Sequence, residues 1–161
     1  MKLDNSKIAF SKADLCKNLI LPEVIDEDLA EEIGLHVGDG SMNFYKIKDK
    51  IKGIYQLRGH LKDDKEHYYK RIKSLYKDLY NINISLRDMP STGVIGFQLW
   101  SDALIQFKHE VLGLSLGKKT NITIPKEIIE NNELSKTFLR GFMIQMGACI
   151  FIKDMENHIQ E

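Results

Sequence analysis

The 161-residue sequence predicts a single mixed α/β (α+β) domain in the order αββαββα, with a four-stranded antiparallel sheet backed by helices. Three observations favour this fold. A helix with apolar periodicity spans residues 26–40, two pairs of alternating segments follow at 41–60 and 83–100, and amphipathic helices lie at 62–80 and 102–111. With 43% hydrophobic residues, the chain is long enough to bury its own core.

The first helix of the domain reads DEDLAEEIGLHVGDG. Its acidic start at residues 26–28 is typical of a helix N-terminus, where carboxylates meet unpaired backbone amides. Ala30, Gly34 and Gly38 recur at every fourth residue and therefore share one face. Glycine destabilises a helix interior by about 1 kcal/mol relative to alanine, so the stripe predicts a second helix packed unusually close. Asp39 stands at the C-terminal end of this helix.

Two alternating segments, Ser41 to Lys48 and Gly53 to His60, predict a β-hairpin that is joined by the polar residues 49–52. Alternation assigns the side chains to two faces. The expected core face carries four large apolar side chains, Met42, Phe44, Tyr55 and Leu57. The expected outward face carries Asn43, Tyr45, Gln56 and Arg58.

The pattern then repeats. Residues 62–80 predict an amphipathic helix whose aromatic stripe belongs to the core. A second hairpin is predicted from Asn83 to Asp88 and Gly93 to Trp100, with the Met-Pro-Ser-Thr turn between them. Ser101 is expected to cap a helix from Asp102 to Val111.

A helix that ends in a carboxylate and is followed at once by a strand is similar to the arrangement in the LAGLIDADG homing endonucleases, and the chain resembles that family. Their nine-residue signature corresponds to Glu32–Gly40, EIGLHVGDG, and the family's catalytic aspartate falls on Asp39. The alternative is that Asp-Gly only forms a turn between helix and strand. In the stretch 113–129, Lys119 is the closest match to the family's active-site lysine, with Lys118 as the near alternative. Both lysines could instead be solvated loop residues.

A second copy of the signature lies near the C-terminus. Leu139–Gly147, LRGFMIQMG, follows the first copy at an offset of 107 residues, so Gly141 corresponds to Gly34. Met146 stands where the family has the second catalytic aspartate, and Ile144 stands at another position where the family commonly has an acidic residue. The sequence ends soon afterwards, so most of a second repeat is expected to be missing.

The resemblance divides the chain into three parts. Residues 1–25 are a lead-in, in which Ser11 could cap a short helix, and residues 26–115 are the first repeat. Residues 116–161 hold the connector, a final helix from Leu134 with the degenerate second signature, and a candidate strand at 149–153. The interface between the two signature helices is expected at Ala30, Gly34, Gly38, Gly141 and Met146.

The resemblance implies metal-dependent cleavage of both strands of duplex DNA, with one carboxylate from each paired helix, and an association with an intron or intein. The implied cofactor is Mg²⁺ or Mn²⁺, bound by Asp39 and Gly38, because such cations prefer oxygen ligands. Methionine has a soft thioether, so Met146 cannot replace a hard ligand. Lys119 would stabilise charge on the phosphate or help to activate a water. One chain is therefore expected to carry half of an active site.

The implied partner is double-stranded DNA, which contacts the curved sheet. A β-ribbon fits the major groove, where Gln56 can pair with adenine and Arg58 with guanine, while hairpin lysines could reach phosphates. The expected contact residues are Asn43, Tyr45, Lys46, Lys48, Gln56, Arg58, Arg87 and Gln98, with Lys50 and Lys52 as further phosphate contacts. A lone chain covers only one half-site, so weak binding is expected.

Charge is unevenly distributed although the formal net charge is zero, which alone would argue against DNA binding. Residues 1–40 hold 4 basic and 9 acidic side chains, whereas residues 41–80 hold 11 and 5. A local basic field matters more to a polyanion than the total charge, so a patch after Asp39 is compatible with DNA. The alternative is that these lysines are scattered over solvated faces.

Several classes of protein are not expected. The sequence has no apolar run near 18 residues and no signal-peptide h-region, so an intracellular, cytoplasmic protein without a membrane span is expected. Cys16 and Cys149 lie far apart without metal-ligand spacing, so a zinc site is not expected.

Three functional interpretations follow. In the first, two chains pair through the helix at residues 26–40, and a homodimer cleaves DNA with one Asp39 from each chain. In the second, the two signature helices pair within one chain, and a catalytically impaired remnant binds DNA in a structural or regulatory role. In the third, the chain is a fragment of a longer protein, and its other half is supplied separately. The replaced residues favour the second or third interpretation. His36 is expected to be packed rather than to act as a general base.

Overall fold

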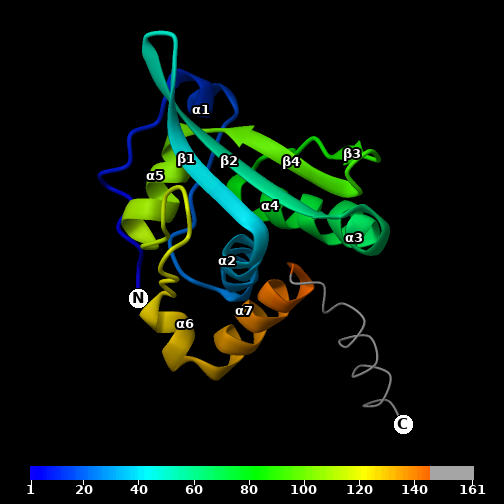
Figure 1. Cartoon of the computed structure of the whole chain (residues 1–161). Helices are drawn as coiled ribbons and strands as arrows, with labels where there is room; N and C mark the ends of the chain where they lie inside the picture. The colour runs from blue at the N-terminus through cyan, green and yellow to red at the C-terminus, as the bar shows by residue number, and fades with distance from the viewer. Residues whose placement is uncertain (146–161) are drawn as a thin grey trace.

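The computed structural model describes residues 1–145 (Figure 1). Four antiparallel strands form one sheet in the order β1-β2-β4-β3, which confirms the predicted fold class. The strands are β1 (Gly40–Ile47), β2 (Lys50–His60), β3 (Arg87–Met89) and β4 (Val94–Trp100). The helices are α1 (Lys12–Cys16), α2 (Glu27–Asp39), α3 (Leu61–His67), α4 (Lys73–Tyr80), α5 (Asp102–Gln106), α6 (Lys126–Glu130) and α7 (Asn132–Gln145). Two π-helical turns, η1 (Tyr68–Ile72) and η2 (Phe107–Val111), continue α3 and α5.

Three of the helices, α1, α2 and α5, begin directly after a capping side chain. The Asp26 carboxylate accepts from the backbone N–H of Leu29 at 2.9 Å and starts α2, and Ser101 caps α5 by accepting from Leu104. Ser11 and Asp14 form a reciprocal capping box at α1. The predicted helices over 62–80 and 102–111 are therefore present, each with a π-helical turn that periodicity does not reveal.

The two hairpins depart from the prediction in opposite ways. The first is longer, because residues 50–52 were expected to form a linker but instead pair with Tyr45, Lys46 and Ile47. The turn needs only Lys48 and Asp49, and Lys48 adopts a φ of 55°. The second hairpin is shorter, since residues 83–86 lie outside the strand β3. In that segment Ile84 is buried in the core and Leu86 is partly buried against it, without ladder pairing.

Alternation assigned the faces of β1 and β2 correctly. Met42, Tyr55 and Leu57 are buried, and Phe44 is partly buried against the same core. The opposite face carries the more exposed Asn43, Tyr45, Gln56 and Arg58. Helices α3, α4 and α5 lie behind the sheet, and the β1–β2 hairpin projects beyond them (Figure 1).

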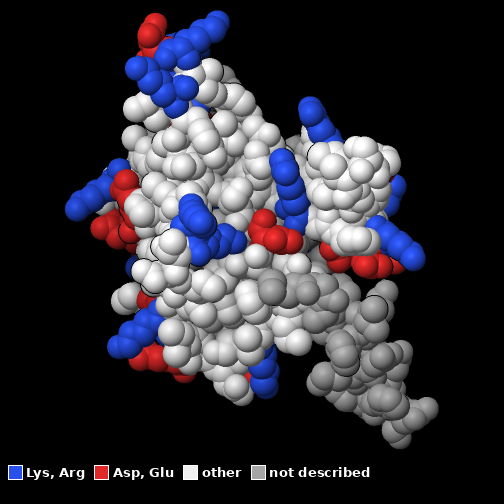
Figure 2. All heavy atoms as spheres, in the orientation of Figure 1, with Lys and Arg blue, Asp and Glu red and all other residues white. Residues whose placement is uncertain are grey.

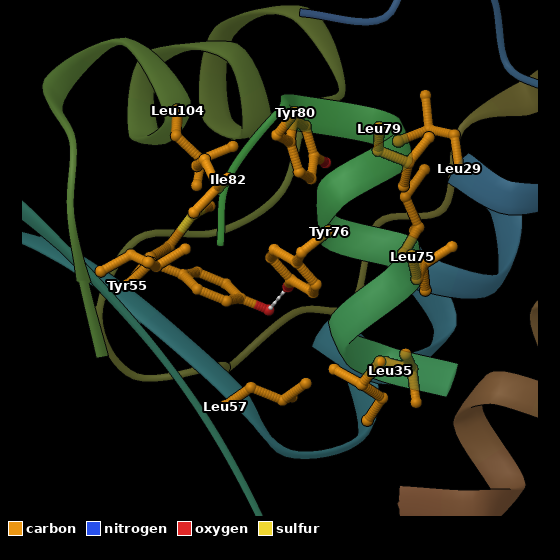
Figure 3. Close-up of a cluster of buried hydrophobic side chains, with 14 of the residues drawn as sticks. Leu29, Leu35, Tyr55, Leu57, Leu75, Tyr76, Leu79, Tyr80, Ile82 and Leu104 are labelled. Atoms are coloured by element: carbon orange, nitrogen blue, oxygen red, sulfur yellow. Dashed lines mark hydrogen bonds between the residues drawn. The ribbon is translucent and has the colours of Figure 1, made fainter. Parts of the chain in front are cut away.

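A polar network is enclosed in the core behind the sheet. Glu32 of α2 and Lys108 of η2 are fully buried and form an ion pair, with Lys108 Nζ 2.6 Å from the second carboxylate oxygen. The hydroxyl groups of Tyr76 and Tyr80 donate to the same carboxylate at 2.6 and 3.1 Å. The hydroxyl groups of Tyr76 and Tyr55 are also hydrogen-bonded to each other at 2.9 Å, among buried leucines (Figure 3). The network joins α2 to β2, α4 and η2, and so fixes α2 behind the sheet.

Helix α7 packs against α2 at very short range (Figure 1). A Cβ added at Gly34 would lie 2.9 Å from the backbone nitrogen of Phe142, and one at Gly38 would lie 2.6 Å from the Cβ of Gln145. A Cβ at Gly141 would meet the carbonyl oxygen of Glu31. At these three positions, a side chain larger than hydrogen would collide with the facing helix. Met146 and the candidate strand at 149–153 lie outside the described residues.

None of the helices within residues 1–145 has the length and apolar character needed to span a membrane.

Candidate functional site

Asp39 is the last residue of α2, and its side chain is exposed where the helix passes into β1. The chain turns there without a spacer because Gly40 begins the strand. A Cβ at Gly40 would lie 2.5 Å from Nδ1 of His36, so only glycine fits beneath that ring. Figure 2 shows an acidic patch over the α2–β1 junction, with basic side chains on both sides. The junction therefore presents a solvent-accessible carboxylate in a basic surrounding.

Lys119 lies against the same helix end. Its Nζ donates to the backbone carbonyl oxygens of His36 at 2.7 Å and Val37 at 3.1 Å, which satisfies two acceptors at the C-terminus of α2. Burial lowers the pKa of Lys119, and the charge of Asp39 opposes that shift. The side chain of Lys118 has no hydrogen bond or ion pair to the described residues. Of the two candidate lysines, Lys119 is therefore the one placed beside Asp39.

The facing end of α7 carries an amide. Gln145 stands 107 residues after Gly38, one position before Met146, and its side chain is 6% exposed. Its Nε2 donates to the hydroxyl of Tyr68 at 3.3 Å, while its Oε1 has no hydrogen-bond partner among the described residues. Neither Gln145 nor Tyr68 was predicted from the sequence as a site residue, although the offset between the two signatures could have indicated Gln145.

At this helix end, the exposed carboxylate of Asp39 is the group that could hold a divalent cation. Asp39 contributes an exposed carboxylate, and Gln145, whose buried amide oxygen has no partner among the described residues, packs against the neighbouring Gly38. Mg²⁺ accepts one or two carboxylates together with waters and phosphate oxygens. Residues 1–145 contain no group of three or more His, Cys, Asp or Glu side chains arranged for a metal. A cation held here would thus need oxygen ligands from a bound phosphate.

His36 is packed and not available as a base. It is 2% exposed, stacks on the ring of Tyr55 at a centroid distance of 5.6 Å, and its Nδ1 has no partner in the described part of the chain. Burial is the main cause that holds the pKa of His36 well below its usual range, and the charges of Lys108 and Lys119 add to it. His36 is therefore neutral in the folded protein at pH 7.

Stability is expected to fall as the pH drops below about 6.5, by up to about 1.4 kcal/mol per pH unit for His36. The reason is that the unfolded chain binds a proton at His36 in that range and the folded chain does not. Urea unfolding measured from pH 7.5 to 5 should show this slope, and a His36→Phe variant, which keeps the aromatic packing, should reduce it. An unchanged slope in the variant would contradict a neutral His36.

The outward face of the sheet collects most of the predicted DNA-contact residues. Cross-strand pairing brings Gln56 level with Gln98, and Arg58 level with Gly96 and, beyond it, Arg87. On β1, Asn43 and Tyr45 lie on the same outward face, whereas alternation puts Lys46 on the face that carries the core residues. Lys46, Lys48 and Lys50 lie at the exposed tip of the β1–β2 hairpin, with Lys52 partly covered next to them.

Trp100 also lies on this face, although it was not predicted from the sequence as a contact residue. Its side chain is 44% exposed, and it pairs with Ile54 at the edge of the glutamine row. The alternation that placed Gln98 outward also places Trp100 outward, so the signal was present in the strand pattern.

Comparisons with known proteins identify the fold. The chain has a TM-score of 0.52 to I-DmoI in complex with DNA and Mn, and 0.50 to the I-DmoI variant Q42AK120M in complex with nicked target DNA and Mn. Identity is 16% in both cases over 74% of this chain, which spans 61% and 60% of those chains.

A sequence relative is also found. An A-type ATP synthase subunit from Pyrococcus abyssi is 28% identical over 133 residues, which is 81% of this chain but only 12% of that protein. No protein-family model matches the chain. The order of strands and helices, the paired glycine-bearing helices and the likeness to I-DmoI together show that this chain has the fold of the LAGLIDADG homing endonucleases.

Proposed function

We propose that this chain is a DNA-binding protein of the LAGLIDADG homing-endonuclease type that carries one of two catalytic helix ends and is impaired in cleavage as a single chain. The pairing of α2 with α7 supports this proposal most directly. One helix ends in Asp39, while the facing helix presents the buried amide of Gln145. The fold of the DNA-bound I-DmoI and the polar outward face of the sheet support binding to duplex DNA.

Each residue at the junction has a role in this proposal. Asp39 binds Mg²⁺ or Mn²⁺, which when bound polarises a phosphate and lowers the pKa of a water. Lys119, fixed by two carbonyl oxygens of α2, stabilises negative charge on the phosphate. Residues 26–115 form the one complete repeat, and residues 116–161 form a connector with the degenerate second signature.

A homodimer built through α2 is less consistent with the packing. Gly34 and Gly38, which would contact a second copy, already contact α7 of the same chain. Two copies of Asp39 could therefore meet across this face only if α7 left it. The remaining route to a complete active centre is a second polypeptide with its own carboxylate.

An Asp39→Asn variant is expected to bind duplex DNA up to about fivefold more tightly at low salt and without divalent cations. The reason is that a like charge about 4 Å from a phosphate costs about 1 kcal/mol in water. Titration of a fluorescent random-sequence duplex by anisotropy, with and without Mg²⁺, measures this change. Added Mg²⁺ should tighten binding by the wild type and should have little effect on the variant.

Asp78→Asn, on the exposed face of α4, is the matched control because it changes the net charge equally but lies behind the sheet. It should leave both titrations unchanged. Equal effects of the two substitutions would exclude a phosphate site at Asp39. In parallel, a monomer by sedimentation that linearises supercoiled DNA would exclude the half-enzyme, and a wild type that binds no duplex would exclude the proposed function.

A further inference from the structure

Antiparallel pairing arranges the outward side chains of the sheet in rows. One row contains Arg58 of β2, Gly96 of β4 and Arg87 of β3. The neighbouring row contains Gln56 of β2 and Gln98 of β4. Rows on one face are two residues apart, or about 6.6 Å along the strand, which is the rise of about two base pairs of DNA.

The residue at the centre of the arginine row, Gly96, contributes no side chain. A Cβ at Gly96 would lie 3.2 Å from the Cγ of Arg58, so the Arg58 side chain extends over this glycine. Arg58 and Arg87 are both exposed, and neither guanidinium has a hydrogen bond or ion pair to another residue in the range 1–145. Two free guanidiniums therefore lie at one level of the sheet.

The glutamine row is a hydrogen-bonded pair. Nε2 of Gln56 donates to Oε1 of Gln98 at 3.3 Å, so Oε1 of Gln56 remains as an acceptor and Nε2 of Gln98 as a donor. Adenine presents one acceptor and one donor in the major groove, whereas guanine presents two acceptors, N7 and O6. The amide pair thus complements an A·T base pair, and a guanidinium complements a guanine.

We propose that the sheet selects duplexes in which a G·C pair and an A·T pair lie about two base pairs apart, read by Arg58 with Arg87 and by the Gln56–Gln98 pair. This inference rests on the proposed binding of DNA. The order is also defined, because Gly40 pairs with Leu57, which places the arginine row at the end of the sheet next to Asp39. The G·C pair is therefore the one nearer to the phosphate at Asp39.

Selection from a pool of randomised duplexes with the full chain tests the inference. The wild type should enrich sequences with the G·C and A·T pairs in the stated spacing, at about tenfold or more over the other bases for each contact. Arg58→Lys keeps the charge but loses the planar fork, so it should lose the G·C preference and keep the A·T preference. Gln98→Ala should do the reverse.

Lys48→Ala is the matched control at the exposed hairpin tip, where the Lys48 ammonium group contacts a DNA phosphate in this proposal. It should weaken binding to all sequences alike and retain both base preferences. The dependence of the logarithm of the binding constant on the logarithm of the salt concentration should become shallower, by about the amount that one phosphate contact contributes. Equal melting temperatures of the variants show that these surface changes leave the fold intact. Enrichment of other bases, or variants that keep both preferences, would overturn the inference while DNA binding stands. Failure to bind any duplex at low salt would overturn the inference and the proposed function together.

Discussion

Gly34→Ala is expected to destabilise the protein by about 3 kcal/mol, at the upper end of the usual cost of overpacking. The new Cβ would lie 2.9 Å from the backbone nitrogen of Phe142 and against the carbonyl group of Phe138. Both neighbours are backbone atoms of α7, so the whole helix has to move. A loss of stability would identify the close helix contact as its cause, because alanine normally stabilises a helix interior by about 1 kcal/mol relative to glycine. Urea unfolding followed by circular dichroism measures the change.

Ser74→Ala on the exposed face of α4 provides the control for this substitution. It should change the free energy of unfolding by no more than about 0.5 kcal/mol, as is usual at the surface. Gly34→Ala should also make the α2–α7 contact more open, so amides of α7 should exchange faster than those of α4. A stabilised Gly34→Ala variant would show that the two helices do not touch at this position in solution.

Lys108→Met is expected to cost about 3–5 kcal/mol, because it leaves the Glu32 carboxylate buried and without its cation. Both side chains are fully buried, and the carboxylate accepts hydrogen bonds from Tyr76 and Tyr80. Those hydroxyl groups cannot replace the charge of Lys108. Burial raises the pKa of both tyrosines, so they remain neutral donors.

The double variant Glu32→Gln/Lys108→Met should recover most of the lost stability. Methionine fills the space of the lysine stem, and the glutamine oxygen still accepts from the two tyrosines, so no charge stays buried. A double-mutant cycle from urea unfolding gives the coupling energy, which should be about 2 kcal/mol or more. Additive effects of the two single substitutions would contradict a direct ion pair.

Local patterns in the sequence predicted the elements of this fold well. The caps at Ser11, Asp26 and Ser101 depend on side chains that accept from backbone amides three residues further on, so they can be predicted without a tertiary structure. The faces of the strands could also be predicted, since the period of two puts alternate residues on opposite sides of the sheet. The lengths of the hairpins could not be predicted from the sequence. Pairing at residues 50–52, and its absence at 83–86, depend on the neighbouring strands.

The candidate site was predicted in part. Asp39 and its position at a helix end follow from one contiguous signature, and Lys119 was one of two alternatives that the connector left open. The choice of Lys119 required the C-terminal carbonyl groups of α2, which lie more than 80 residues away in the sequence. Tyr68 and Gln145 meet only because η1 and α7 approach the same helix end.

The sequence by itself determined that α2 has a face without side chains and that a carboxylate stands at its end, because both follow from spacing within one helix. Only the tertiary structure decided that α7 of the same chain covers this face, and that Glu32 is neutralised by Lys108. It also decided that two arginines share a level of the sheet around Gly96. These contacts join segments far apart in the chain, and their formation depends on strand register and helix packing, which no local pattern specifies.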